Sequence, residues 1–317
     1  MRKILKWVAW ALLILFIVIN AVCAWQAFIF THFSQEKISK NQEQQNVIPQ
    51  KFSRILGKKH PRQLVVDSLP VPHQSLFITS GTLKLASWYL KHNTDTITKG
   101  TVIMFHGYGS SRSDIIPEAT TFYKMQYNVL MIDFRAHGNS EGNICSMGYY
   151  ESNDVKAAFD FISNTGEKNI ILWGGSMGAA AITKAMHDDY SIKPSKIILE
   201  KCFGRMTDAA NALARNSMHE PARPFGALLT FWGSVELGTY LFNMNPKQYV
   251  KKINCPALIQ WGDQDENVSK QETQSIYDNL GSSKKKLVIY PDCKHENFSL
   301  KQPVLWKKSV NDFLSSQ

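Results

Sequence analysis

The sequence predicts an α/β protein whose core is a mostly parallel, eight-stranded sheet with helices on both faces. Short, nearly all-apolar runs of strand length recur along the chain, and segments with helical periodicity separate most of them. Apolar runs without alternation are typical of parallel strands that are covered on both faces. The first two runs lack a helix between them, so we expect an antiparallel hairpin at one edge. In sheets of this kind, sites form at the carboxyl ends of the strands.

The expected elements follow one another in a regular order. Strands are expected at residues 75–79, 83–90, 101–105, 128–133, 170–173, 196–199, 257–260 and 286–290. Helices are expected at residues 115–125, 149–164, 177–187, 270–280 and 303–314. Between residues 199 and 257 there is no clear sheet pattern, so we expect an insertion at about 204–250 to form a helical cap over the site. Its aromatic residues could line an acyl pocket, touch a membrane or pack the cap onto the domain; they are Phe231, Trp232, Tyr240 and Phe242.

An apolar run without a single charge extends from residue 7 to residue 30. Roughly 20 helical residues cross a hydrocarbon core of about 30 Å, so this run is long enough to span a membrane with some tilt. We therefore expect an N-terminal transmembrane anchor at residues 1–33. A polar segment rich in Gln, Lys and Asn follows and predicts a stalk at 34–62. The folded domain is expected at 63–317 and includes the cap.

Flanking charge predicts how the anchor is oriented. Arg2, Lys3 and Lys6 precede the apolar run, which favours a single-pass protein with a cytoplasmic N-terminus and an extracytoplasmic (periplasmic or luminal) domain. The alternative is a secreted protein, because the same basic residues and the sequence Val22-Cys23-Ala24 fit a cleaved signal peptide. The apolar run is longer than the usual signal-peptide core and continues to Phe30, which favours an uncleaved anchor.

The distribution of charge and cysteine excludes several classes of protein. The net charge is +10, but residues 1–62 hold ten Lys and Arg against two acidic residues, and the rest holds 26 against 24. The basic excess therefore belongs to the leader, where it suits anionic headgroups or a solvated linker, and we expect no nucleic-acid partner. No C-x-x-C pair is present, and we expect neither a metal nor an organic cofactor. Free, buried thiols are the default expectation for Cys23, Cys145, Cys202, Cys255 and Cys293, although pairing within the domain is left open.

The strongest chemical motif is Gly174-x-Ser176-x-Gly178, between an apolar strand and a helix that starts with small residues. A serine on such a tight turn projects its hydroxyl above the sheet, and glycines two residues to either side avoid clashes with the neighbouring strand and helix. We therefore predict Ser176 as a nucleophile. The helix N-terminus also directs the backbone N–H of Met177 at an oxyanion that would form there.

A nucleophilic serine needs a base and an acid that orients the base. In this architecture the chain order is nucleophile, acid, histidine. Asp265 and His295 follow two successive later strands, so we predict that His295 takes the serine proton and that Asp265 orients it. Asp263 is the local alternative for the acid, but the G-x-x-D spacing favours Asp265. Asp292 lies too close to the histidine in sequence to have the reach.

Two further polar loops follow strands. The turn His106-Gly-Tyr-Gly comes after the strand at 101–105, and the backbone N–H of Tyr108 is expected to be the second oxyanion donor. His106 itself is expected to shape the loop. The segment Asp133-Phe-Arg-Ala-His-Gly contains residues that could suggest a metal or phosphate site, but we favour a hydrogen-bonded structural loop.

Together these loops resemble the α/β-hydrolase superfamily, and most of all its serine-aminopeptidase-like and BEM46-like members. Their versions read H-G, D-x-R-G-H-G-x-S-x-G, G-x-S-x-G, G-x-x-D and H, and the resemblance covers about residues 75–315. It implies hydrolysis of an ester, thioester or amide through an acyl-enzyme. The chain departs in having Ala136 where glycine is usual and no Gly-Gly before His295. A serine at position 176 argues against dehalogenases and epoxide hydrolases, which use a carboxylate there.

The expected function is that of a membrane-anchored serine hydrolase acting on a carboxylic ester, with a small-molecule, lipid-like or acylated substrate. Two alternatives stay open. One is a peptidase or amidase of the same fold, since the triad does not encode leaving-group preference. The other is a catalytically silent binding protein on a hydrolase scaffold, against which the complete serine, aspartate and histidine set argues. The sequence does not indicate an oligomeric state.

Overall fold

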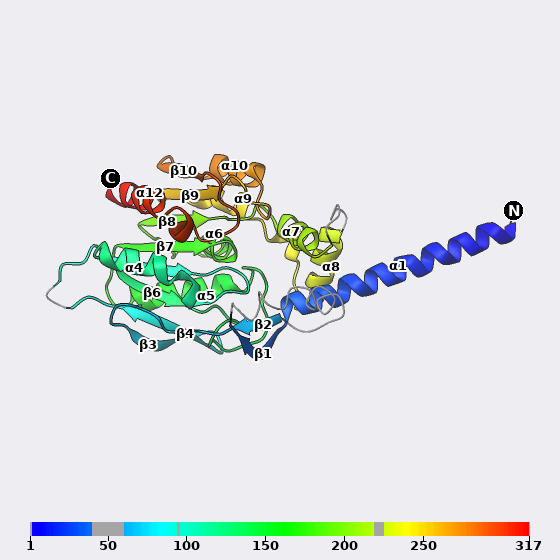
Figure 1. The fold of residues 1–317 in the computed structure, drawn as a ribbon, viewed down its shortest axis with the longest axis horizontal. Helices are drawn as coiled ribbons and strands as arrows, with labels where there is room; N and C mark the ends of the chain where they lie inside the picture. The colour runs from blue at the N-terminus through cyan, green and yellow to red at the C-terminus, as the bar shows by residue number, and fades with distance from the viewer. Residues whose placement is uncertain (1, 40–59, 94–95, 219–224, 317) are drawn as a thin grey trace.

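An eight-stranded sheet runs through the centre of the molecule, and helices cover both of its faces (Figure 1). The computed structural model describes residues 2–39, 60–93, 96–218 and 225–316. The strands are β3 (Gln74–Ser80), β4 (Leu83–Leu90), β5 (Thr101–Phe105), β6 (Asn128–Ile132), β7 (Ile170–Gly175), β8 (Lys196–Glu200), β9 (Ala257–Gly262) and β10 (Lys285–Tyr290). Their order is β10-β9-β8-β7-β5-β6-β4-β3, and only β3–β4 and β4–β6 are antiparallel. The predicted fold and its edge hairpin are confirmed.

Burial on both faces explains why the central strands are apolar throughout. Along β5, Ile103 and Phe105 pack under α5 and α6, whereas Val102 and Met104 pack under α4 and α12. Adjacent residues thus serve opposite layers. The covering helices are α4 (Ile116–Lys124), which follows the 3-10 turn η1 (Arg112–Ile115), α5 (Glu151–Ser163), α6 (Met177–Asp188), α10 (Lys270–Asn279), α11 (Phe298–Lys301) and α12 (Pro303–Ser315).

The insertion between β8 and β9 is helical, as the sequence predicts. Its main helices are α7 (Met206–Met218) and α8 (Phe225–Leu237), which lie together at one end of the domain (Figure 1). The short elements η2 (Leu241–Asn243), α9 (Pro246–Tyr249) and η3 (Val250–Lys252) then lead back to the sheet. Alanines of α7 line the cavity over the elbow between β7 and α6. The insertion therefore caps the carboxyl ends of the strands.

The first helix, α1 (Arg2–Thr31), projects from the domain and carries the N-terminus away from it (Figure 1). Within the described ranges it is the one helix long and apolar enough to cross a membrane, by length and composition. Residues 2–18 are exposed, and from residue 19 onward the helix packs against α8. There Trp232 donates its indole N–H to Asn20 Oδ1 at 3.2 Å. The apolar helix therefore has two parts, one free of the domain and one docked on the cap.

The chain passes from α1 directly into contacts with the domain. Strands β1 (Phe33–Ile38) and β2 (His60–Gln63) form a small parallel sheet, and the ring of Phe33 is buried. Arg62 donates to the carbonyl of Ser140 at 2.6 Å. The range expected as a stalk, 34–62, thus begins and ends in paired strands, while residues 40–59 lie outside the described part of the chain. Because three consecutive side chains of β1, those of Gln35, Glu36 and Lys37, are exposed, the strand has no apolar alternation that would reveal it.

Candidate active site

The turn between β7 and α6 holds Ser176 in a strained backbone conformation, with φ of 53° and ψ of −112°. The flanking glycines are needed for steric reasons. A Cβ on Gly174 would lie 2.6 Å from a backbone nitrogen of α6, and a Cβ on Gly178 would collide with the carbonyl of Phe105. Strand and helix thus approach the turn closely on both sides, and their packing keeps the serine in this conformation.

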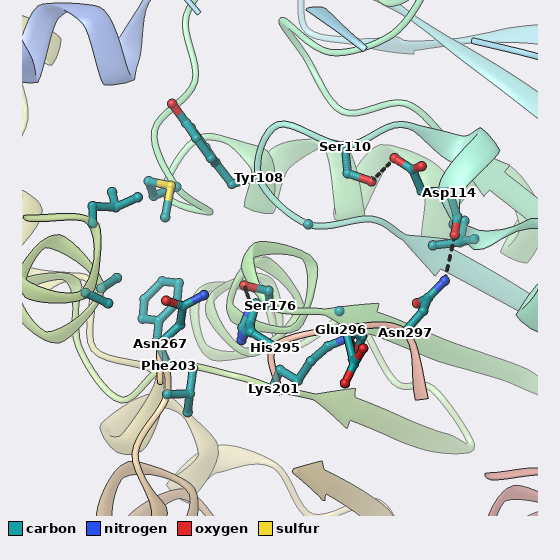
Figure 2. A pocket seen from close by; sticks show the side chains of 18 of the residues that line it. Tyr108, Ser110, Asp114, Ser176, Lys201, Phe203, Asn267, His295, Glu296 and Asn297 are labelled. Atoms are coloured by element: carbon teal, nitrogen blue, oxygen red, sulfur yellow. Dashed lines mark hydrogen bonds between the residues drawn. The ribbon is translucent and has the colours of Figure 1, made fainter. Parts of the chain in front are cut away.

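The side chains of Ser176, His295 and Asp265 form one hydrogen-bonded chain. His295 Nε2 lies 3.0 Å from Ser176 Oγ (Figure 2), and His295 Nδ1 lies 2.8 Å from Asp265 Oδ2. The second carboxylate oxygen of Asp265 accepts the backbone N–H groups of Asn267 and Val268 at 2.8 and 2.9 Å. The Asp265 side chain is completely buried. A carboxylate fixed in this way orients the imidazole so that Nε2 faces the serine hydroxyl.

The alternative acids lie outside this arrangement. Asp263 and Asp292 are exposed, and the Nδ1 position of His295 is taken by Asp265. The backbone N–H of Asp265 donates to the carbonyl of Gly262 at 3.1 Å, which closes a turn at the end of β9. This turn gives the G-x-x-D spacing its physical basis. The structure therefore brings the three predicted side chains together.

The two residues predicted to supply oxyanion donors, Met177 and Tyr108, lie in segments that meet at Ser176. Met177 is the first residue of α6, a position at which a backbone N–H has no partner within the helix. The loop after β5 lies against the elbow, because a Cβ on Gly107 would stand 3.5 Å from the Cβ of Ser176. Tyr108 follows in that loop and points away from Ser176 (Figure 2), donating its hydroxyl to the carbonyl of Phe30 in α1 at 2.9 Å. The contact with α1 has no signal in the sequence.

Two buried histidines hold the loop that carries Tyr108. His106 Nε2 accepts the backbone N–H of Phe134, and His137 Nε2 accepts that of Gly109, both at 3.1 Å. Because a backbone N–H can only donate, both rings carry their proton on Nδ1, which donates to a backbone carbonyl at 2.7 and 2.9 Å respectively. Burial lowers the pKa of both imidazoles, in keeping with neutral rings. These contacts support a structural role for His106.

The polar loop after β6 is a hydrogen-bonded structure, as expected. The completely buried Asp133 pairs with the Arg112 guanidinium and accepts the Arg112 backbone N–H at 2.7 Å. Arg135 pairs with Asp154 at 2.6 Å. Ala136 has φ of 64°, the left-handed conformation that explains why glycine is usual at this position of the motif. No group of three or more His, Cys, Asp or Glu side chains within the described ranges is arranged to hold a metal.

Lys201 is a site residue that the sequence did not reveal. It directly follows β8 with φ of 53°, is almost completely buried and lines the same cavity as Ser176. Its ammonium group donates to the carbonyl of Glu296 at 2.6 Å, next to His295 in the chain (Figure 2). Lys201 thus ties the histidine loop to the end of β8. A charged residue directly after an apolar strand was the available signal.

Two carboxyl groups are buried beneath the site. Glu200, at the end of β8, accepts the indole N–H groups of Trp173 and Trp306 at 3.0 and 2.7 Å. Glu118 of α4 accepts the hydroxyl of Ser299 at 2.7 Å. Burial, together with the nearby charge of Glu200, raises the pKa of Glu118 to about 7. Of these two carboxyl groups, Glu118 is thus the one expected to titrate near neutral pH.

A cavity of about 470 Å³ opens above Ser176. The strand-end loops supply its polar wall, and α7 supplies an apolar wall. The side chains of α7 that take part are Ala209, Ala212 and Leu213. The cysteines lie outside the hydrogen-bonded chain of the site. All five are free, and four are buried as expected, whereas Cys255 is only partly buried.

Comparison with known proteins identifies the family. A model of the family described as serine aminopeptidase, S33, matches residues 96–223 and 238–299, more than half of the chain. The chain belongs to this family of α/β-hydrolases. The stretch that the family model leaves unmatched, 224–237, corresponds to α8. The predicted relationship to serine-aminopeptidase-like hydrolases is confirmed.

Curated relatives are distant but extend over most of the chain. YqkD of Bacillus subtilis is 24% identical over 221 residues, which cover 69% of this chain and 72% of that protein. Protein bem46 of Schizosaccharomyces pombe is 24% identical over 229 residues, or 70% of each chain. Caffeoylshikimate esterase of Arabidopsis thaliana is 25% identical over 277 residues, which cover 71% of this chain and 82% of that protein.

Solved structures show the same fold. An esterase of Pyrococcus furiosus superposes with a TM-score of 0.66 at 24% identity, covering 80% of this chain and 96% of that one. Est1E of Butyrivibrio proteoclasticus, solved with ferulic acid bound, gives a TM-score of 0.58 at 18% identity, covering 75% of this chain and 97% of that one. The family therefore identifies this chain as a hydrolase of α/β-hydrolase fold.

Proposed function

We propose that this chain is a membrane-anchored serine hydrolase that cleaves carboxylic esters through an acyl-enzyme. The observation that carries the proposal is the unbroken hydrogen-bonded chain from Asp265 through His295 to Ser176, at the mouth of a cavity. Each contact has the length that proton transfer requires. The strained elbow places the hydroxyl beside a helix N-terminus, where negative charge is stabilised.

The reaction follows from these positions. His295 Nε2 takes the proton of Ser176 as Oγ attacks the ester carbonyl, and Asp265 stabilises the imidazolium that results. The backbone N–H groups of Met177 and Tyr108 stabilise the tetrahedral oxyanion. His295 then donates its proton to the leaving alcohol, and the acyl group stays on Ser176. Water, deprotonated by His295, cleaves the acyl-enzyme and restores the serine.

The lining of the cavity favours an ester over an aminopeptidase substrate. To bind the free amino group of a peptide, the cavity would need an available carboxylate in its wall. Two acidic residues line the cavity, and both carboxylates bind groups of their own loops. Asp114 accepts the hydroxyl of Ser110 at 2.6 Å, and Glu296 accepts the backbone N–H of Lys294 at 3.1 Å. The ammonium of Lys201 lies in the same cavity and would repel an amino terminus.

Labelling with a fluorophosphonate tests the nucleophile. We expect the wild-type protein to be labelled and Ser176→Ala to be unlabelled. Ser191→Ala, at an exposed serine in the loop after α6, is the matched control and keeps its label. A folded but unlabelled wild type would favour the silent binding protein. Rates on p-nitrophenyl esters and on aminoacyl p-nitroanilides then separate the two enzymatic alternatives, and faster anilide hydrolysis would favour the peptidase.

Anchoring is the second part of the proposal, with the N-terminus in the cytoplasm and the domain outside. Residues before the alternative cleavage site, such as Asn20, contact the cap through Trp232. Cleavage near Ala24 would remove that contact and expose part of the buried face of α8. We expect the protein to stay in membranes after alkaline carbonate extraction, with its full-length mass and a domain accessible only from the outer side. A soluble product that begins after residue 24 would support the secreted alternative.

A further inference from the structure

A second, smaller cavity of about 40 Å³ lies between α1, α7 and α8. Its lining is almost entirely apolar, and two of its residues, Met147 and Leu213, also line the cavity over Ser176. These two side chains form the partition between the spaces. The anchor helix contributes Ala27, Phe30 and Thr31 to the wall. The small cavity thus lies behind the apolar wall of the candidate active site.

The cavity offers little to a polar ligand. Its two hydroxyl side chains both donate within their own helices, Thr31 to the carbonyl of Ala27 at 2.8 Å and Thr230 to that of Gly226 at 2.7 Å. Apolar cavities of this kind stay dry and bind apolar groups. The volume of the small cavity, about 40 Å³, is larger than the space that a single water molecule needs. An aliphatic chain end fits these conditions.

Two of the three helices that enclose the cavity, α1 and α8, lie outside the family match. The family model matches no residue of α1 or α8, and these two helices pack directly on each other. The same α1 continues beyond the domain as an exposed, uncharged stretch between Trp7 and Val18. The wall of the small cavity is therefore continuous with a surface suited to the hydrocarbon of a membrane.

We propose that the small cavity is the distal end of the substrate site and receives the end of a fatty-acyl chain, with the anchor helix as one of its walls. The inference rests on the proposed ester hydrolysis at Ser176. The ester carbonyl lies at the serine, the chain extends along the α7 wall, and its terminal methylenes pass between Met147 and Leu213. Met147 has an unbranched side chain and Leu213 is branched only at Cγ, so both can change rotamer without moving the backbone.

A substitution that fills the small cavity from α1 tests whether this helix forms part of the substrate site. Ala27 is buried against the cap, so Ala27→Phe places a ring in the cavity, whereas Ala21→Phe puts the same ring on the exposed side of α1. We measure kcat/KM for p-nitrophenyl acetate and p-nitrophenyl decanoate with the full chain in mixed micelles of fixed composition. Each buried methylene group changes the rate about fourfold, so losing contact with two of them lowers the decanoate-to-acetate ratio about 15-fold in A27F. In A21F the ratio stays at the wild-type value.

An opening substitution gives an independent measure in case the ring displaces α1. Leu213→Ala removes half of the partition and raises the decanoate-to-acetate ratio severalfold. The inference is wrong if wild type hydrolyses both esters and neither A27F nor L213A changes the ratio. If folded wild type hydrolysed neither ester, the proposed function would be contradicted instead. The two failures are therefore distinguishable.

The origin of the chain is tested with two further esters that carry the same acyl group. One is a monoacylglycerol in the micelle, and the other is a peptide with an O-acylated serine. If A27F hydrolyses one of these esters more slowly than A21F does, the inference is supported. The ester that shows this difference identifies the source of the chain as lipid or acylated protein. Hydrolysis of both at rates equal in A27F and A21F would overturn it.

Discussion

The carboxyl edge of the sheet and the N-terminal segment both reach the candidate active site, but they are built differently. At the edge, each reactive side chain lies within a few residues of a strand end. Ser176 directly follows β7, and Asp265 and His295 come shortly after β9 and β10. The N-terminal segment reaches the same place through long-range packing. Its carbonyl at Phe30 accepts the hydroxyl of Tyr108, 78 positions along the chain.

The difference separates two kinds of contribution. In the proposed mechanism, the edge supplies the groups that move protons and stabilise charge, and its hydrogen bonds join Asp265, His295 and Ser176 at 2.8 and 3.0 Å. The N-terminal segment supplies part of the apolar wall of the small cavity and accepts one hydrogen bond from Tyr108 in the loop after β5. We therefore expect substitutions at the edge to change rates by orders of magnitude. Substitutions at the contacts with α1 should change selectivity or rate by about 15-fold or less.

The largest expected effect at the edge is that of Asp265→Asn. Because Asp265 Oδ1 accepts two backbone N–H groups, an asparagine would keep its oxygen there and turn its amide NH₂ toward His295. The ring then carries its proton on Nε2 and can no longer accept the proton of Ser176. We expect kcat for p-nitrophenyl acetate to fall about 10⁴-fold.

The matched control for this substitution is Asp263→Asn, at the exposed acid two residues earlier. It removes the same charge from the same loop and should change kcat by no more than about twofold. Equal losses in the two variants would mean that charge near the loop, and not the tautomer of His295, governs the rate.

The next effect concerns stability beneath the edge and depends on pH. Burial raises the pKa of Glu118 to about 7 in the folded protein, above its unfolded value. Its stabilising effect is therefore complete at acidic pH and is lost as pH rises through 7. Glu118→Gln has no proton to lose and keeps the bond to Ser299 available. Between pH 5 and pH 8.5 the free energy of unfolding should fall less in E118Q than in wild type. The difference between the two decreases should be roughly 2–3 kcal/mol.

Chemical denaturation at the two pH values measures the difference. Glu266→Gln, at an exposed carboxyl on the loop after β9, controls for the loss of one negative charge. If wild type, E118Q and E266Q showed the same change in stability with pH, Glu118 would not be the group that couples folding to pH.

The sequence predicts the edge well because its signals are local. Apolar runs locate the strands to within two residues, and the glycines around Ser176 reflect close approaches of strand and helix that any such elbow must have. The G-x-x-D spacing identifies Asp265 because the turn after β9 is closed by its own backbone. The catalytic roles of these residues stay predictions until they are measured.

The remaining contacts depend on which distant segments meet. Phe33 is buried and β1 pairs with β2, whereas the polar composition of residues 34–62 predicted a stalk. Lys201 binds a carbonyl 95 positions away, which no local spacing indicates. The docking of α1 on α8 joins two apolar helices whose patterns alone fit a free anchor and a simple cap. Such pairings are decided by packing, and a single sequence does not contain a pattern for them.

The smallest expected effect tests whether the N-terminal segment influences the chemistry at all. Tyr108→Phe removes only the hydroxyl that donates to Phe30 and leaves the backbone N–H in place. A net hydrogen bond is worth about 1 kcal/mol, so a loop held less firmly should lower kcat for p-nitrophenyl acetate about fivefold. Tyr150→Phe is the matched control, because that hydroxyl also donates to a carbonyl of another segment, Leu237, at 2.9 Å. Both variants should lose similar stability, but only Y108F should lose rate. Equal rates in Y108F and Y150F would mean that α1 supports the fold without positioning the loop after β5.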